Sequence, residues 1–111
     1  MNENFFLIEH PIIKRDVTIL RDINTDTETF RAALQRVSNI LAVELSKEFK
    51  LTDTEVETPL EKTQGAKLTH DVILVPVLRA GLGMVNGFLQ IIPEAKVGHI
   101  GLQRDEETLK P

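Results

Sequence analysis

The chain has 111 residues, of which 41% are hydrophobic and 27% charged, a balance typical of one globular domain or of part of one. Its formal net charge of -4 excludes the strongly basic surface with which proteins bind nucleic acid or anionic membranes, so a small-molecule ligand is the first class to consider. The absence of cysteine excludes disulfides and cysteine-ligated metal, and it fits a reducing compartment.

The N-terminal stretch MNENFFLIEHPII lacks the features of a secretion signal or a membrane span. No basic region precedes its apolar residues, it carries Glu3 and Glu9, and its apolar run is too short to cross a bilayer. We therefore expect a cytoplasmic protein. No repeat, low-complexity tract or linker divides the sequence, so residues 1–111 are expected to form one unit.

A helix is predicted to begin near residue 25 and to end near Phe49. Thr25 and Glu28 match the S/T-x-x-E capping box, in which a hydroxyl and a carboxylate satisfy backbone N–H groups at a helix start. Apolar residues then recur every three or four positions and form a single stripe for packing. The stripe consists of Phe30, Leu34, Val37, Leu41 and Leu45.

The following segment, residues 51–71, is rich in turn-forming residues. Residues 55–58 alternate between polar and apolar until Pro59, and Gln64 with Gly65 is typical of a turn. One or two short strands are predicted here.

A buried strand is predicted over residues 72–78, VILVPVL. Its near-continuous apolar character is typical of a parallel strand covered on both faces, with Pro76 at its exit or beside a bulge.

The apolar spacing from Leu82 to Ile92 predicts a short helix that Pro93 ends, with Gly83 and Gly87 one turn apart for close packing on the sheet. A second strand is predicted over residues 96–102. Strand, helix and strand together predict a βαβ crossover, and hence an α/β fold with a parallel sheet.

Two arginines, Arg79 and Arg104, lie just past the two predicted strands. In open α/β sheets ligands bind beyond the carboxyl ends of strands, which would place these guanidinium groups near a ligand. Gly81 and Gly83 would let backbone N–H groups approach an anion at a helix N-terminus, and a guanidinium holds phosphate through two parallel hydrogen bonds. The pattern is neither G-x-G-x-x-G nor a P-loop. Spacing alone leaves two interpretations open, a phosphate site or an Arg79 ion pair beside glycines that only pack.

Longer stretches resemble a known family. VPVLRAGLGM, followed by PEAKVGHIGLQRDEETLKP, closely resembles uracil phosphoribosyltransferase, and so do HPIIKRDVTILRDINTDTETFR and ETPL. The resemblance implies a partial type I phosphoribosyltransferase fold, with a parallel sheet and an N-terminal helical segment. It also implies the family's reaction, in which 5-phosphoribosyl 1-pyrophosphate (PRPP) and uracil give UMP and diphosphate with the help of Mg²⁺.

The same resemblance implies roles for particular residues. RAGLG would be the pyrophosphate loop, with the backbone of Ala80, Gly81, Leu82 and Gly83 around the anion, and Arg79 and Arg104 would contact PRPP. Some family members have a GTP effector. A homo-oligomer is also expected, because the predicted strands leave an apolar sheet edge without a partner. Asp16, Val43 and Gln103 depart from the family's commonest pattern.

Part of the family's site has no counterpart in this sequence. No stretch resembles the acidic PRPP motif that holds the 5-phosphate, or the C-terminal segment that reads uracil. We therefore expect an N-terminal portion that is inactive alone and that supplies no catalytic residue. His10, His70 and His99 lack metal-site spacing, so structural roles are expected for them and no metal held by the protein.

Two other interpretations compete with the enzyme portion. One is an interaction or regulatory protein that keeps an anion-binding loop without catalysis. The other is a different nucleotide-binding α/β domain, which Gly81 and Gly83 alone support.

Overall fold

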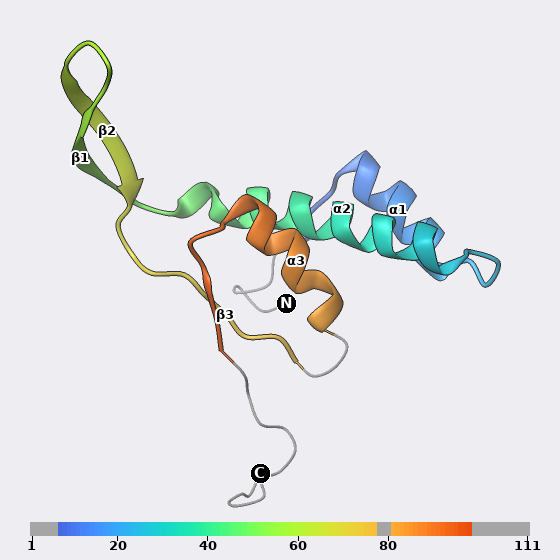
Figure 1. Ribbon diagram of the computed structural model, residues 1–111. Coiled ribbons are helices and arrows are strands. Elements are labelled where there is room, and N and C mark those ends of the chain that lie inside the picture. The colour runs from blue at the N-terminus through green and yellow to red at the C-terminus, as the bar shows by residue number, and fades with distance from the viewer. Residues whose placement is uncertain (1–6, 78–80, 99–111) are drawn as a thin grey trace, which may run out of the picture.

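The structure is a computed structural model that describes residues 7–77 and 81–98 (Figure 1). The elements in chain order are α1 (Pro11–Arg21), α2 (Thr27–Leu45), the 3-10 turn η1 (Ser46–Glu48), β1 (Leu51–Glu57), β2 (Lys62–Leu68), β3 (Ile73–Leu74), α3 (Leu82–Ile91) and β4 (Lys96–Val97). The three helices pack together, whereas the β1–β2 hairpin projects away from them (Figure 1). Within the described ranges, no helix is both long and apolar enough to cross a membrane.

Helix α1 was not predicted from the sequence, because its β-branched residues are poor helix formers. Its start nevertheless carries two helix signals. Pro11 occupies the first turn, and the Nδ1 atom of His10 accepts a hydrogen bond from the Ile12 amide at 3.1 Å. The buried Asp16 carboxylate accepts hydrogen bonds from Arg36 of α2, which fixes α1 against α2.

The predicted capping box at Thr25 is wrong. The N-cap of α2 is Asp26, whose Oδ1 accepts from the Thr29 amide at 2.7 Å. The Thr25 hydroxyl instead donates to the Ile19 carbonyl at 2.7 Å and so closes the turn from α1. A carboxylate is the stronger acceptor at the positive end of a helix, which favours the observed start. The α-helix ends at Leu45, and η1 continues to Glu48, close to the predicted end.

The buried face of α2 differs from the predicted stripe. Of the five stripe residues only Val37 is buried, and Phe30 and Leu45 are 39% and 53% exposed. The buried face consists of Ala33, Val37, Ser38 and Ala42. At Ser38 a small side chain is required because Gly87 of α3 approaches α2 closely there.

The hairpin turn lies five residues before the predicted one. β1 and β2 pair antiparallel from Leu51 opposite Leu68 to Glu57 opposite Lys62, which places Gly65 inside a strand. Its turn is closed by a hydrogen bond from the Thr58 amide to the Glu61 carbonyl at 2.8 Å. The Thr58 hydroxyl also accepts from the Glu61 amide, so side-chain chemistry favours this turn over the predicted Gln64–Gly65 pair.

The strands β3 and β4 pair in parallel, with Ile73 opposite Lys96 and Leu74 opposite Val97. Each covers two residues, fewer than the predicted 72–78 and 96–102, and residues 78 and 99–102 lie outside the described part. β3 ends before the buried Pro76, which lacks the amide hydrogen that a continuing ladder requires. Helix α3 matches its predicted bounds within one residue.

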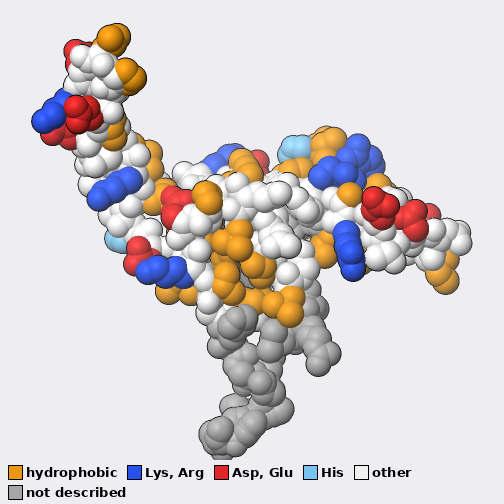
Figure 2. Space-filling model, viewed as in Figure 1, with side chains coloured by type: hydrophobic (Ala, Val, Ile, Leu, Met, Phe, Trp, Pro, Cys, Tyr) orange, Lys and Arg blue, Asp and Glu red, His pale blue; other side chains and the backbone are white. Residues whose placement is uncertain are grey.

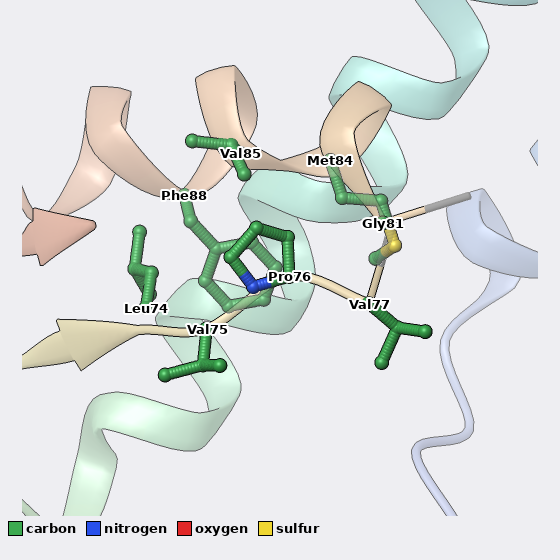
Figure 3. Close-up of a pocket in the computed structure, with 8 residues that line it drawn as sticks. All are labelled: Leu74, Val75, Pro76, Val77, Gly81, Met84, Val85 and Phe88. Atoms are coloured by element: carbon green, nitrogen blue, oxygen red, sulfur yellow. The ribbon is translucent and has the colours of Figure 1, made fainter. Parts of the chain in front are cut away.

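One face of the β3 segment is open. Leu74 and Pro76 point toward α3, and Val75 points away (Figure 3). Ile73, Val75 and Val77 are 61%, 46% and 57% exposed. Hydrophobic side chains accordingly gather on the surface near β3 and α3 (Figure 2). The apolar run predicts a strand that other elements cover on both faces. In the part of the chain that the structure describes, one face of this strand stays uncovered.

Candidate functional site

The candidate site lies where β3 leads into α3. Residues 78–80 connect Val77 to Gly81, and α3 begins at Leu82. This junction is at the carboxyl end of a parallel strand and at a helix N-terminus, as predicted for the RAGLG stretch. Arg79, Ala80 and Arg104 lie outside the described residues, so their expected contacts with phosphate stay predictions.

The two ends of this connection are held together by the backbone. The Gly81 N–H donates to the Val77 carbonyl at 2.7 Å. A β-carbon added at Gly81 would lie 2.9 Å from the Val77 nitrogen and 3.1 Å from its oxygen. Because both of these atoms belong to the backbone, they cannot move aside as a flexible side chain would. Glycine is therefore the residue that permits this close approach of position 81 to the Val77 backbone.

The amides of Leu82 and Gly83 are the first two of α3. They occupy the first turn of α3, whose N–H groups have no partner within the helix and carry its positive dipole end. The first turn contains no acidic residue that would compete for these donors. The Gly81 N–H already donates to the Val77 carbonyl. Among residues 81–83, the candidate donors for an anion are therefore the amides of Leu82 and Gly83.

Gly83 and Gly87 pack against α2 and not against the sheet, so the predicted contact for them is wrong. A β-carbon at Gly83 would lie 2.7 Å from Cδ2 of Leu34, and one at Gly87 would clash with Cβ of Ser38. The β-carbon at Gly87 would also lie 2.9 Å from the Gln35 carbonyl oxygen. The spacing of these glycines was read correctly, but a sequence does not say which element faces them.

Asn39 provides a polar link between α2 and α3. Its Nδ2 donates to the Gly87 carbonyl at 2.7 Å and to Oε1 of Gln90 at 3.1 Å. Sequence analysis missed this residue. A lone asparagine inside a helix gives no signal of its partner, because that partner lies 48 residues further along the chain.

An apolar cavity of about 280 Å³ lies between the β3 segment and α3 (Figure 3). It is lined by Leu74, Val75, Pro76, Val77, Gly81, Met84, Val85 and Phe88. These residues include no titratable side chain, so the lining of the cavity offers no acid–base chemistry.

Groups that could hold a metal ion are absent from the part of the chain that the structure describes. No three acidic or histidine side chains cluster there. His10 caps α1 and His70 is exposed, which fits the expected structural roles, and His99 lies outside the described part.

Comparison with known proteins gives one consistent result. The family model for uracil phosphoribosyltransferase matches residues 7–111. The uracil phosphoribosyltransferase of Salinibacter ruber is 48% identical over 109 residues, which are 98% of this chain and 52% of that protein. The uracil phosphoribosyltransferase of Finegoldia magna is 52% identical over 106 residues, 95% of this chain and 51% of that protein. The chain thus spans about half the length of the curated relatives that it matches.

A solved structure agrees with this result. The AQ2163 protein from Aquifex aeolicus superposes with a TM-score of 0.81 at 37% sequence identity, covering 95% of this chain and 51% of that protein.

Proposed function

Because the chain belongs to the uracil phosphoribosyltransferase family, we propose that it forms the part of such an enzyme that holds the pyrophosphate of PRPP. The reaction is the transfer of the phosphoribosyl group to uracil, which releases diphosphate and leaves UMP. One observation carries the assignment. Gly81, whose N–H donates to the Val77 carbonyl, directly precedes α3, where the amides of Leu82 and Gly83 have no partner within the helix.

In this proposal the loop stabilises the leaving group. Negative charge grows on pyrophosphate as its bond to the ribose breaks, and fixed donors that face this charge lower the barrier. The helix dipole and the amides of Leu82 and Gly83 supply part of that field. Arg79 and Arg104 supply two guanidinium groups that can each bind phosphate bidentately. Magnesium arrives bound to PRPP, as part of the substrate complex.

The rest of the site belongs to elements without a counterpart in this sequence. Recognition of the 5-phosphate and of uracil is assigned to them, and residues 1–111 alone do not complete a turnover. The open face of β3, with Ile73, Val75 and Val77, supports a further layer or a second copy of the chain at this position. A homo-oligomer in a cytoplasmic setting is part of the proposal, and GTP as an effector stays an expectation.

The same open face also favours the second candidate, an interaction protein without catalysis. A contiguous exposed apolar surface is a common feature of protein–protein contacts. An interaction protein can keep an anion-binding loop, but it does not need that loop to match PRPP. The two functions therefore differ in whether Arg79 and Arg104 contribute to the affinity for PRPP.

Equilibrium binding to the purified chain separates these functions. Calorimetric titration with PRPP in the presence of Mg²⁺ should show binding, and Arg79→Ala and Arg104→Ala should each weaken it by about tenfold or more, because charge-assisted hydrogen bonds to phosphate are strong. Arg21→Ala, at an exposed arginine at the end of α1, is the matched control and should bind normally. Unchanged affinity in both loop variants would favour the interaction protein.

A further inference from the structure

The contact between α2 and α3 has almost no free space at one point. Ser38 and Gly87 are both buried, and their backbones approach so closely that a β-carbon on Gly87 would overlap with that of Ser38. The Ser38 hydroxyl turns back into its own helix and donates to the Leu34 carbonyl at 2.8 Å. This contact sets the distance between the two helices, but a smooth apolar contact does not prevent one helix from sliding or turning against the other.

Asn39, the next residue, supplies the directional constraint. Both side-chain hydrogen bonds that join α2 to α3 in the described part of the chain come from its Nδ2 atom. The bond to the Gly87 carbonyl, at 2.7 Å, is the shorter of the two and acts on the backbone of α3. A hydrogen bond has a narrow range of distance and angle, so it fixes α3 along its axis and in rotation.

Any displacement of Gly87 is transmitted to the start of α3. Gly87 and Leu82 belong to one uninterrupted ten-residue helix. They are separated by five residues, or about 7.5 Å along the axis, and an α-helix of this length moves as a rigid element. The amides of Leu82 and Gly83 are therefore positioned from α2, through α3.

We propose that Asn39 is a positioning residue for the phosphate-binding amides at the N-terminus of α3. This inference rests on the proposed function, because it assigns Asn39 to the same loop. Asn39 touches no substrate. It acts through the Gly87 carbonyl, and its effect is on how well the amides of Leu82 and Gly83 match the anion.

Asn39→Asp and Asn39→Ala test the proposal. Aspartate keeps the size of the side chain but loses both donor hydrogens, and alanine removes the group without adding charge. Asn24→Asp is the control, since Asn24 is exposed in the loop before α2 and gains the same charge. Affinity for magnesium pyrophosphate is measured by calorimetry well below each variant's unfolding temperature, and amide spectra of the same samples report on the fold.

The expected result is a roughly three- to tenfold weaker affinity in both Asn39 variants, the range that follows from losing one net hydrogen bond. The amide resonances of Leu82 and Gly83 should shift, and those of α1 and of the hairpin should stay in place. Asn24→Asp should bind as the wild type does. If Asn39→Asp does not fold, the neutral Asn39→Ala variant gives the same comparison.

The two hypotheses fail in different ways. Wild-type affinity in folded Asn39 variants, with pyrophosphate still bound, would overturn the positioning role and leave the proposed function intact. A loss of stability without a loss of affinity would do the same, because it would reduce Asn39 to a packing residue. No binding of pyrophosphate by the wild-type chain would refute the proposed function, and the positioning role with it.

Discussion

The carboxylate of Asp16 and the guanidinium of Arg36 form a bidentate ion pair that joins α1 to α2. Arg36 donates from Nε to Oδ2 and from Nη2 to Oδ1, each at 2.9 Å. The Asp16 side chain is completely buried, whereas that of Arg36 is 43% exposed. The hydrogen bonds from Arg36 lower the pKa of Asp16 below its ordinary value of 3.8, against the effect of burial, and the charges of Arg36 and Arg15 act in the same direction as these bonds.

This pair predicts an acid-sensitive component of stability. A carboxyl group with a lowered pKa in the folded chain stabilises the fold above its unfolded pKa, and that stability is lost as the pH falls through the folded pKa. The free energy of unfolding should therefore fall below about pH 4. Asp16→Asn should flatten this fall and lower stability near neutral pH by about 1.5–3 kcal/mol.

Urea unfolding between pH 2 and pH 7 measures this effect. Asp53→Asn, at an exposed carboxylate in β1, is the control, and its free energy of unfolding should depend on pH as that of the wild type does. Identical pH profiles for the wild type and Asp16→Asn would mean that the pair contributes nothing to the fold.

Gly87→Ala should destabilise the chain by about 1–3 kcal/mol, as overpacking of a close contact does. In an isolated helix the same change would be favourable by about 1 kcal/mol. The difference arises because the new β-carbon would meet Ser38 and the Gln35 carbonyl. Thermal unfolding measures it, with Gly65→Ala as a control at a site where the nearest atom would be 3.4 Å away. Increased stability of Gly87→Ala would contradict the close approach of the two helices.

The open face of β3 predicts self-association. With Ile73, Val75 and Val77 exposed and β4 as the described neighbour of β3, the chain should form a dimer or a higher oligomer. Val75→Glu should shift this equilibrium toward monomer, whereas Ile23→Glu, at a residue 94% exposed before α2, should not. Light scattering behind size exclusion, over a wide dilution range, is the test. A monodisperse wild-type monomer with cooperative unfolding would show that these residues close a core alone.

The sequence predicted α3 well because several local signals agree there. The apolar spacing from Leu82 and Pro93 after its end both favour one helix. The parallel pairing around it followed from the same βαβ pattern. Local signals were weaker in α1, where β-branched residues hid a helix that Asp16 and Arg36 stabilise from 20 positions apart.

Contacts between elements could not be predicted from the sequence. The Thr25 hydroxyl donates to the Ile19 carbonyl at the end of α1. Because α1 had not been predicted, this partner was not foreseen and Thr25 was interpreted as a helix cap. Gly83 and Gly87 were assigned to the sheet because their spacing fits packing on either a sheet or a helix. Asn39 was missed for the same reason, since its partner is a backbone carbonyl in another helix.

The purified chain should form no UMP from uracil and PRPP with Mg²⁺, because the proposed site lacks the groups that position the 5-phosphate and the base. A radiochemical assay, with protein from a host that lacks its own enzyme, measures this. Magnesium-dependent turnover by the 111-residue chain would show that the chain contains a complete site.

The most direct test of the account is a titration of the isotope-labelled chain with magnesium pyrophosphate, followed through its amide resonances. If the junction of β3 and α3 is the pyrophosphate site, the amides of Leu82 and Gly83 should shift most and the Gly81 amide, bonded to Val77, should shift less. Uracil should cause no shift. An unchanged spectrum with pyrophosphate, or shifts confined to α1 and the hairpin, would contradict the central claim that this junction binds the leaving group of the reaction.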